Sequence, residues 1–484
     1  ARKVAAPIQA ATAEDLDRSL AIDLSEYMTR RLNGVYTNDV QNNPLQPDIN
    51  YRGYTASPLL GTPQGISVYL DGMRLNQPFG DVVSWDLIPR AALSSITLVP
   101  GSNPLFGLNT LGGALAIQTK DGRRFAGTSA QVTAGSHGRA AVEFEHGGSV
   151  AGGPHWFVTG QIFRERGWRV DSPSDVGQLF AKAGQRFGAT DVTLTLSAAD
   201  TDLNGNALQE SRLLAADYAG VYTKPDNTRN RALLLNLAAT HTLDEHWSIT
   251  GNAYARRIHT HTFNGDINDD ALDRAVYQPT AAEQQALTAA GFTGFPTVGE
   301  SAANTPFPKW RCIANALLND EPAEQCNGLV NRGSTRQSNA GLTLRLNHDG
   351  RIGALAARSL LGVGLDTSRT RFLQSTELGY LNPDRSITGV GAFGDGATGG
   401  TVDGAPFDTR VDLAGRSTTA SVFGSSIVTL TEAVHLTLSG RYNRSQLRNR
   451  DAITPGGGAG SLDGDHRFAR FNPALGLTFS PVAG

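Results

Sequence analysis

The two cysteines of the chain, Cys312 and Cys326, are the first residues whose chemistry can be judged from their spacing. Two thiols without a neighbouring histidine are a poor ligand set for zinc, which takes four ligands. In an extracytoplasmic loop the two would instead form a disulfide, because disulfides persist in oxidising compartments. Such a bond would close a loop of about 15 residues and stabilise it by about 3 kcal/mol in the chain-entropy model. The sequence predicts a structural disulfide if this segment lies outside the cytoplasm.

An acidic run, in which Asp200, Asp202 and Asn204 precede Gly205, matches the opening of a calcium-binding loop, D-x-D-x-N-G. The twelfth position of such a loop supplies a bidentate glutamate, and in this chain it is Ser211. The motif is therefore incomplete, and solvated loop carboxylates explain it as well as Ca²⁺ does. A weak calcium site at Asp200, Asp202 and Asn204 is kept as a hypothesis, and no cofactor is required.

A second pair of candidate metal ligands is His259 and His261, which would share one face of a strand, with Asp266 nearby. Two imidazoles are an incomplete ligand set, so polar residues at the rim of a sheet are the simpler interpretation. Catalytic motifs are missing from the sequence. Neither a phosphate-binding G-x-x-x-x-G-K-S/T loop nor a G-x-S-x-G nucleophile elbow occurs, so the sequence does not predict an enzyme.

Composition narrows the class of protein further. The 484 residues carry a formal net charge of −3 with only 18% charged side chains, and 55 of them are glycine. This balance excludes a basic nucleic-acid-binding protein and a highly charged disordered chain. No run of about 18 apolar residues occurs, so no transmembrane helix is expected.

From about residue 125 to the end, one pattern recurs, in which apolar and polar residues alternate strictly between loops rich in Gly, Asp and Asn. In one such segment Val434, Leu436, Leu438 and Tyr442 fall on one face of a strand, because successive side chains point to opposite faces. Many segments reach about ten residues, the length that a tilted strand needs to cross a bilayer. About twelve strands are predicted, near residues 127–135, 139–148, 155–165, 177–187, 190–200, 230–242, 246–260, 335–347, 356–371, 416–429, 434–447 and 465–480.

Two folds have strands in which apolar and polar residues alternate in this way, and the lengths of the connections distinguish them. A soluble β-sandwich also has one apolar face. Here, however, short turns such as 187–191 and 430–434 alternate with long connections at 201–230, 261–334 and 373–416. Outer-membrane barrels have short periplasmic turns and long outer loops in that order, whereas a sandwich has no reason for it. The pattern predicts a transmembrane antiparallel β-barrel, apolar toward lipid and polar inside.

The first 125 residues are different, because their segments are short, mixed and rich in turns. Residues 12–32 predict two short helices. Asp71-Gly72, between two β-rich runs, is typical of a type I′ hairpin, and Gly112-Gly113 permits a close backbone approach before a strand. A small mixed α/β domain is therefore expected here.

Five motifs follow one another in this domain. They are Asn50-Tyr51-Arg52-Gly53-Tyr54, Val68-Tyr69-Leu70-Asp71-Gly72, Ile96-Thr97-Leu98-Val99-Pro100-Gly101, Pro104-Leu105-Phe106-Gly107 and Gly112-Gly113-Ala114-Leu115-Ala116-Ile117-Gln118-Thr119-Lys120. In order and spacing they resemble the plug domain of TonB-dependent outer-membrane receptors. Each motif alone is weak, but all five in sequence, followed by a barrel pattern, are a specific signal. For the strands that follow, the resemblance rests on the architecture alone and not on sequence motifs.

The size of the barrel follows from the domain that it must hold. Twelve strands would enclose too narrow a space for about 125 residues, and a plugged lumen goes with about 22 strands. We therefore expect 22 strands in the complete barrel and a chain truncated at its C-terminus. The predicted fold is mainly β, with an α/β plug domain at residues 1–125 and a transmembrane β-barrel at residues 126–484.

The resemblance also implies which residues close the pore. Plug arginines of the family pair with acidic residues on the barrel wall. Arg52 matches one such position, whereas the second arginine is absent, which leaves Arg90 or Lys120 as candidates for closure. The TonB box of the family is not recognisable in residues 1–10. The other plug-motif residues assigned to closure are Gly53, Asp71, Gly72, Gly101, Gly107, Gly112 and Gly113.

The function implied by the resemblance is active import of a scarce solute across the bacterial outer membrane. Its partners would be TonB with the inner-membrane energising complex, the lipid of the outer membrane and a small-molecule ligand, without nucleic acid. Ferric siderophores and other ferric chelates are the largest substrate group of the family and the expected ligands. Carbohydrate, cobalamin, haem, copper and peptide remain alternatives. A passive porin is a further alternative, against which the plug motifs argue. The sequence does not assign ligand-binding residues.

Overall fold

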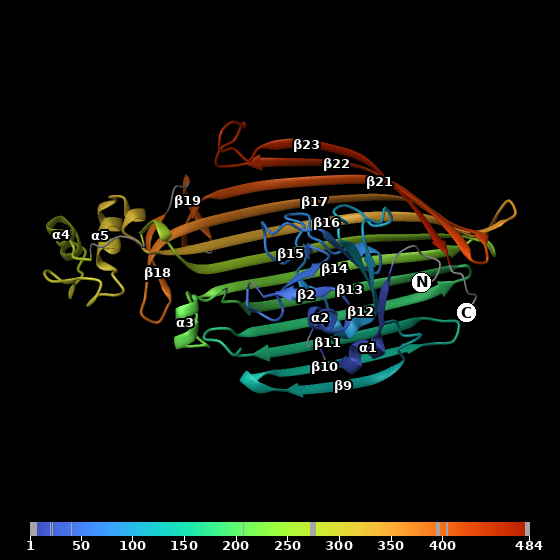
Figure 1. Ribbon diagram of the computed structural model, residues 1–484, viewed down its shortest axis with the longest axis horizontal. Helices are drawn as coiled ribbons and strands as arrows, with labels where there is room; N and C mark the ends of the chain where they lie inside the picture. Colours follow the sequence, from blue (N-terminus) through green and yellow to red (C-terminus); the bar gives the residue numbers. More distant parts are fainter. Residues whose placement is uncertain are drawn as a thin grey trace.

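The computed structural model of the chain describes residues 7–19, 21, 23–39, 41–206, 208–271, 277–393, 397–402 and 405–479. It contains one large antiparallel sheet of long strands and a small N-terminal domain that lies against one face of this sheet (Figure 1). Within the described ranges, no helix is long and apolar enough to cross a membrane.

The large sheet is built from strands that pair with their neighbours in the sequence, each antiparallel to the next. The twelve predicted strands are confirmed. They are β9 (Gly127–Ala134), β10 (Ala140–Ser149), β11 (His155–Glu165), β12 (Ser174–Phe187), β13 (Thr190–Asn204), β14 (Asp226–Thr242), β15 (Trp247–Ile267), β16 (Gly328–Ile352), β17 (Leu355–Leu381), β21 (Val411–Thr431), β22 (Val434–Asp451) and β23 (Gly464–Phe479).

The prediction was wrong about where several strands end. β16 and β17 continue for many residues into segments that were expected to be loop, and β18 (Ile387–Phe393) pairs with β17 beyond them. A hairpin of β19 (Ala397–Val402) and β20 (Ala405–Thr409) follows. Apolar alternation marks only the part of a strand that has one regular apolar face, whereas the ladder of backbone hydrogen bonds continues into segments whose apolar residues, such as Val330 and Leu378, pack in small clusters with the outer connection.

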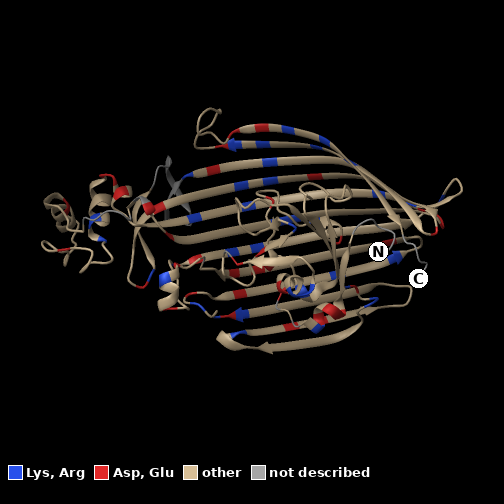
Figure 2. Ribbon diagram, viewed as in Figure 1, with Lys and Arg blue, Asp and Glu red and all other residues tan. Residues whose placement is uncertain are grey.

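The two faces of the sheet differ as the alternation predicts. On β14, Leu235 points outward and is 43% exposed, whereas the next residue, Asn236, points toward the N-terminal domain and is 3% exposed. The same alternation gives exposed leucines at Leu342 on β16 and Leu365 on β17. One face is therefore an apolar band of aliphatic side chains, and the opposite face is polar. Lys and Arg recur along neighbouring strands in the half of the sheet nearer α3 and α5 (Figure 2).

The connections differ in length between the two ends of the sheet. The long ones lie at one end and carry the outer helices, while the short turns lie at the other end, near both chain termini (Figure 1). The helical segments of the connections are η3 (Ser136–Gly138), α3 (Ser211–Ala216), η4 (Asp269–Ala271), α4 (Ala281–Ala289), α5 (Trp310–Leu318) and η5 (Pro322–Glu324).

The N-terminal domain contains two small sheets and two short helices. One sheet has the order β1-β7-β8-β5-β6 and the other has the order β2-β3-β4. The two helices predicted within residues 12–32 are confirmed. The elements are β1 (Gln9–Thr12), α1 (Ala13–Ser19), α2 (Leu24–Arg31), β2 (Val35–Asn38), β3 (Asp48–Tyr51), β4 (Tyr54–Ala56), β5 (Ile66–Leu70), β6 (Met73–Arg74), η1 (Trp85–Leu87), η2 (Arg90–Ala92), β7 (Leu93–Pro100) and β8 (Gly113–Thr119).

The core of this domain lies between its five-stranded sheet and α2. Val68, Ile96 and Ile117, from three neighbouring strands, have no solvent exposure. The same apolar cluster includes Leu234 of β14 and Tyr254 of β15, so the domain packs against the wall of the large sheet through shared core residues. Burial of such aliphatic side chains contributes roughly 1.5–3 kcal/mol each. The last strand of the domain ends at residue 119 and the wall begins at residue 127, and the predicted boundary falls between them.

Candidate functional site

The contact between the N-terminal domain and the wall includes a buried carboxylate, Asp86, which the short helix η1 presents to the wall. Asp86 is 2% exposed. Its Oδ2 accepts hydrogen bonds from the Thr201 hydroxyl at 2.7 Å and from Asn230 Nδ2 at 2.9 Å, and its backbone carbonyl accepts one from Gln178 Nε2 at 2.6 Å. Burial raises the pKa of this carboxyl, and the hydrogen bonds to the charged form oppose the rise. Side chains from three strands of the wall, β12 to β14, thus donate hydrogen bonds to Asp86 of the N-terminal domain.

Among the ion pairs that join the same two bodies, three have a cation that is at most 10% exposed. Asp71 pairs with Lys182 of β12 at 2.9 Å, Arg90 pairs with Glu143 of β10 at 3.3 Å, and Lys120 pairs with Glu145 of β10 at 2.8 Å. The Lys120 side chain is only 3% exposed. Removing one partner of a buried pair leaves the other charge desolvated and costs about 3–5 kcal/mol. These pairs therefore resist separation of the domain from the wall.

Arg256 of β15 binds the backbone of the N-terminal domain from the wall. Its guanidinium donates to the backbone carbonyl of Leu75 at 2.6 Å, to that of Asn76 at 3.3 Å and to Asn339 Oδ1 at 3.0 Å. The side chain is 5% exposed. Because the acceptors in the N-terminal domain are backbone carbonyls, the contact fixes the position of the chain between β6 and η1.

Arg52, the residue matched to pore closure by resemblance, lies elsewhere. It is exposed, it has a positive φ of 53°, and its guanidinium lies 5.5 Å from the centre of the Tyr51 ring. Among the described residues no carboxylate lies within ion-pair distance of it. Its role in closure stays a prediction, whereas the alternatives Arg90 and Lys120 do pair with the wall.

Asp71 and Gly72 form the two-residue turn of the β5–β6 hairpin, between the paired residues Leu70 and Met73. Both turn residues have positive φ, 47° and 84°, as a type I′ turn requires. The carboxylate of Asp71 also accepts hydrogen bonds from the backbone N–H and the hydroxyl of Thr119. The sequence reveals the turn, but the ion pair to Lys182 of the wall could not be read from it.

At the remaining glycines of the plug motifs, the local backbone geometry or a close neighbour explains why the residue is glycine. Gly53 and Gly101 have φ of 79° and 77°, which favour glycine. A Cβ at Gly107 would lie 2.9 Å from the Tyr69 hydroxyl, and one at Gly112 or Gly113 would lie 2.7 Å from a neighbouring atom. These positions shape the domain, and their part in gating stays a prediction.

A cavity of about 730 Å³ lies between the N-terminal domain and strands β14 to β17, toward the end with the long connections. Residues 58–61 and 79–82 of the domain form one side of it, and polar side chains of the wall form the other. The rings of Phe79 and Phe372 meet across it at 4.9 Å between centroids. Arg332, the one cationic residue among the described residues that line it, is paired with Glu377 at 2.7 Å. This cavity suits a polar molecule rich in hydrogen-bonding groups.

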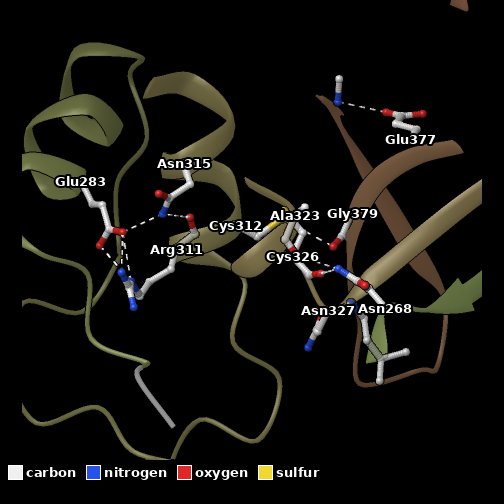
Figure 3. Close-up of a disulfide and its surroundings, with 12 residues drawn as sticks. Asn268, Glu283, Arg311, Cys312, Asn315, Ala323, Cys326, Asn327, Glu377 and Gly379 are labelled. Carbon is white, nitrogen blue, oxygen red and sulfur yellow. Dashed lines mark hydrogen bonds and ion pairs between the residues drawn. A yellow bond between two sulfur atoms is a disulfide. The ribbon is translucent and has the colours of Figure 1, made fainter. Parts of the chain in front are cut away.

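The longest described connection carries the two cysteines, and the structure joins them in a disulfide with the two Cα atoms 4.5 Å apart (Figure 3). Both are at most 1% exposed. The bond ties α5 to the chain just before β16. Asn268, at the other end of the connection, donates to the backbone carbonyl of Cys326 at 2.7 Å.

Beside the disulfide, Glu283 of α4 holds the outer helices together (Figure 3). It accepts hydrogen bonds from Arg311 Nε at 3.0 Å and from Asn315 Nδ2 at 2.6 Å. Burial acts to raise the pKa of Glu283, but these hydrogen bonds and the Arg311 charge outweigh it, so that the pKa lies below its usual value. The connection is therefore a small packed unit.

The suggested calcium ligands lie in strand β13, not in a loop. Asp200 pairs with Arg231 at 2.9 Å, Asp202 pairs with Arg229 at 2.8 Å, and Asn204 accepts a hydrogen bond from Asn227. The extended backbone spreads the three side chains along one face. No group of three or more His, Cys, Asp or Glu side chains placed to hold a metal ion occurs in the described part of the chain. The calcium site stays an untested hypothesis.

Comparison with known proteins gives two results. Residues 1–114 match the family model "TonB-dependent Receptor Plug Domain". No curated protein sequence matches the chain.

Solved structures that resemble the chain include the unliganded ferric citrate transporter FecA, with a TM-score of 0.69 and 13% identity over 100% of this chain. The ferric yersiniabactin uptake receptor FyuA of Yersinia pestis has a TM-score of 0.65 and 12% identity over 99% of this chain. The siderophore receptor PiuA of Acinetobacter baumannii has a TM-score of 0.68 and 13% identity, also over 99%. The chain spans 61% of the length of FecA and 63% of the other two. Likeness at these identities establishes the fold.

Proposed function

The chain carries a TonB-dependent receptor plug domain and has the fold of these receptors, and we propose on that basis that it imports a scarce solute across the bacterial outer membrane. This family and fold are those of transporters, not of enzymes. The apolar band of the sheet would face the lipid of the outer membrane. TonB, driven by the inner-membrane energising complex, would displace the plug.

One observation carries this proposal. The plug lies against the polar face of the wall and is held there by Asp86, Arg256 and three ion pairs, most of them buried. Breaking these contacts together leaves several buried charges without partners, at about 3–5 kcal/mol each, so the displaced plug is a rare state without an input of work. A solute can pass only when work is done on the plug, which is the role of an energised partner.

The proposed ligand is a ferric siderophore or another ferric chelate. Two features of the cavity of about 730 Å³ support it. The volume lies in the usual range of small-molecule sites. Its wall offers amide and hydroxyl groups, such as those of Asn264, Asn331 and Thr335, and these suit a chelate that presents many oxygen atoms. The similar structures include a ferric citrate transporter, and this likeness supports the same class of ligand.

The test measures ligand binding and transport by the full-length receptor. Radioactive ferric citrate, a ferric catecholate and a ferric hydroxamate are given to cells that produce the receptor, with and without TonB. We expect one of them to accumulate only where TonB is present. Saturable accumulation of cobalamin, a carbohydrate, haem, copper or a peptide instead would replace iron as the cargo. Uptake that does not require TonB would contradict the proposal and favour a passive pore.

A matched pair of variants locates the ligand. Gln374 lines the cavity, whereas Asn227 on the opposite face of the wall binds Asp202 and Asn204. Gln374→Ala should weaken ligand binding about fivefold or more, as the loss of one hydrogen bond of about 1 kcal/mol predicts. Asn227→Ala should leave ligand affinity unchanged. Equal effects of the two changes would show that the ligand binds elsewhere.

A further inference from the structure

A carboxylate, Asp226, lines the cavity of about 730 Å³ among amide side chains. Asp226 is the first residue of β14 and lies directly opposite Asn264 of β15, which in turn lies opposite Asn331 of β16. All three line the cavity, because alternate side chains of these strands face the N-terminal domain. The cavity therefore holds a negative charge within a row of hydrogen-bonding groups.

The hydrogen bonds of this row point toward Asp226. The Thr376 hydroxyl donates to Asn331 Oδ1 at 2.8 Å, and Asn331 Nδ2 donates to Asn264 Oδ1 at 3.4 Å. The Asn264 side chain in turn hydrogen-bonds to Asp226 and favours its charged form. A carboxylate can accept about four hydrogen bonds, so Asp226 keeps acceptor capacity for a ligand.

The protein supplies no cation to Asp226 within the described ranges. Lys224, two residues earlier, pairs instead with Asp384 at 3.3 Å. The charge that acts on Asp226 is that of another carboxylate, Asp266 of β15. Arg332 also lines the cavity, but its guanidinium is paired with Glu377. The charge of Asp226 is therefore left for a ligand to balance.

Asp226 lies outside the segment that would cross the lipid. Leu233, the first exposed leucine of β14, comes seven residues later, or about 24 Å along the strand. Burial raises the pKa of the Asp226 carboxyl to about 7, the hydrogen bond from Asn264 opposes the rise, and the Asp266 charge adds to it. A cation beside Asp226 would lower this pKa again, so that binding of a cation and loss of the proton are coupled.

A second cavity, of about 400 Å³, has the opposite charge. It is lined by side chains from residues 339–345 of β16, whereas the first is lined by side chains from residues 331–337, nearer the long connections. Its wall includes Arg345 and Arg441, whose guanidinium carbons lie 5.9 Å and 4.7 Å from the centre of the Phe423 ring. Neither arginine is paired with a carboxylate in the described part of the chain. An anion would favour this second cavity, and a cation would favour the first.

We propose that the imported ligand is a ferric chelate with a free ammonium group and that Asp226 binds this group. The inference rests on the proposed function and adds the charge of the cargo to it. An ammonium group has three donors and forms strong, charge-assisted hydrogen bonds with a carboxylate. The amides beside Asp226 would contact the oxygen atoms of the chelate. Ferric citrate and ferric catecholates are anionic, so the carboxylate would disfavour them.

The test compares two chelates that differ by a single charge. One is a linear ferric trihydroxamate with a terminal ammonium group, and the other is the same chelate with that amine acetylated. Ferric citrate is the anionic probe. Binding to the full-length receptor in detergent is measured by calorimetry at neutral pH. We expect the ammonium chelate to bind at least tenfold more tightly than the acetylated one, as the loss of one charge-assisted hydrogen bond predicts.

Variants assign this preference to Asp226. Asp226→Asn should remove the preference and leave the affinity for the acetylated chelate unchanged, whereas Asp226→Glu should keep part of the preference. The matched control is Asp175→Asn, because Asp175 is an exposed carboxylate of the wall that is paired with Arg164 at 2.9 Å. It should change neither affinity.

The pH dependence provides a readout that a purely structural role of Asp226 would not give. The carboxyl must lose its proton to bind a cation, so the affinity for the ammonium chelate should rise between pH 6 and pH 8. This rise should be absent in Asp226→Asn and for the acetylated chelate.

Two results would overturn the proposal. One is equal binding of the two trihydroxamates. The other is tighter binding of ferric citrate that is lost in Arg441→Gln and kept in Asp226→Asn, which would assign the ligand to the second cavity. Uptake into cells with and without TonB is measured with the same probes. Uptake of an anionic or uncharged chelate that requires TonB contradicts the charge assignment alone, whereas uptake without TonB contradicts the import proposal.

Discussion

Arg256 and Arg257 are neighbours in β15, and they experience opposite surroundings because successive side chains of a strand point to opposite faces. Arg256 is 5% exposed and donates to two backbone carbonyls of the plug. Arg257 is exposed and has no carboxylate partner in the described ranges. At this point of the wall the inner face thus supplies protein partners for an arginine, whereas the outer face leaves its neighbour exposed. The difference shows that the same residue type binds the N-terminal domain from one face of the wall and is exposed on the other.

The largest effect is expected from breaking the inner half of that comparison. Arg256→Met leaves the carbonyls of Leu75 and Asn76 without their donor, and each unsatisfied group costs about 1–3 kcal/mol. We expect the free energy that holds the plug in place to fall by about 3 kcal/mol, measured as the urea concentration at which protease cleaves the plug. Arg257→Met is the matched control and should change it by less than about 0.5 kcal/mol. Equal shifts would show that the two faces do not differ as described.

A somewhat smaller effect is expected at the ion pair of Asp71 and Lys182. Lys182→Met leaves the carboxylate of Asp71, 14% exposed, without its cation, and should cost about 2–3 kcal/mol by the same protease assay. Asp71→Asn in addition should recover part of the loss, because it removes the uncompensated charge. The double-mutant cycle should give a coupling of about 0.5–3 kcal/mol. Strict additivity would mean that Asp71 acts only as a turn residue.

A third comparison sets burial against distance. The Arg90–Glu143 pair is longer, 3.3 Å, but its side chains are only 10% and 18% exposed, whereas Arg164–Asp175 is 2.9 Å long and mostly exposed. Exposed pairs contribute at most about 1 kcal/mol. Arg90→Gln should therefore lower the thermal midpoint of the plug more than Arg164→Gln does. A larger effect at Arg164 would show that distance outweighs burial here.

The last comparison concerns the pH dependence of two carboxyl groups whose pKa values are shifted in opposite directions. Burial raises the pKa of Asp23, the N-cap of α2, to about 6 from a usual value of 3.8. The folded state then binds the proton more tightly than the unfolded state, so this contribution favours folding at low pH and is lost as the pH rises from about 4 to about 6. Asp23→Asn keeps the cap and should remove this dependence.

Glu283 in the outer connection has the opposite sign. Its pKa is lowered, so its contribution is present above about pH 4.5 and is lost as the pH falls. Hydrogen exchange at α2 and α4 between pH 3 and pH 7 measures both. The protection of α2 against exchange should decrease as the pH rises, and the protection of α4 should decrease as the pH falls. In the Glu283→Gln variant the protection of α4 should not depend on pH in this way. Changes of the same sign at both helices would contradict these assignments.

Sequence reasoning recovered the strands of the wall because their side chains alternate between an apolar outer face and a polar inner face at every second residue. It missed the outer extensions of β16 and β17, where apolar residues such as Val330, Leu378 and Leu381 are irregularly spaced and pack in small clusters with β18 and the outer connection. The motif order of the first 125 residues was informative because glycines and the Asp71 turn impose local backbone geometry.

The contacts between plug and wall could not be predicted in the same way. Asp86 is joined to Thr201 and Asn230, residues more than a hundred positions away, and no local pattern encodes such a pairing. The only sequence feature that points to the contact of Asp86 is that a carboxylate stands within the mainly apolar run of residues 82–87. Arg52 was selected by resemblance, but in this chain it lies exposed beside Tyr51, while Arg90 and Lys120 reach carboxylates of β10.

The central claim of the proposed function is that buried contacts hold the plug against the wall and that the pore would stay closed until TonB acts. Single-channel conductance of the full-length receptor in planar bilayers tests it most directly, with Arg256→Met compared with Arg257→Met. We expect wild type and Arg257→Met to conduct almost no ions, and Arg256→Met to show frequent large openings. A wild-type receptor that conducts freely, or an Arg256→Met receptor that remains closed, would contradict the account.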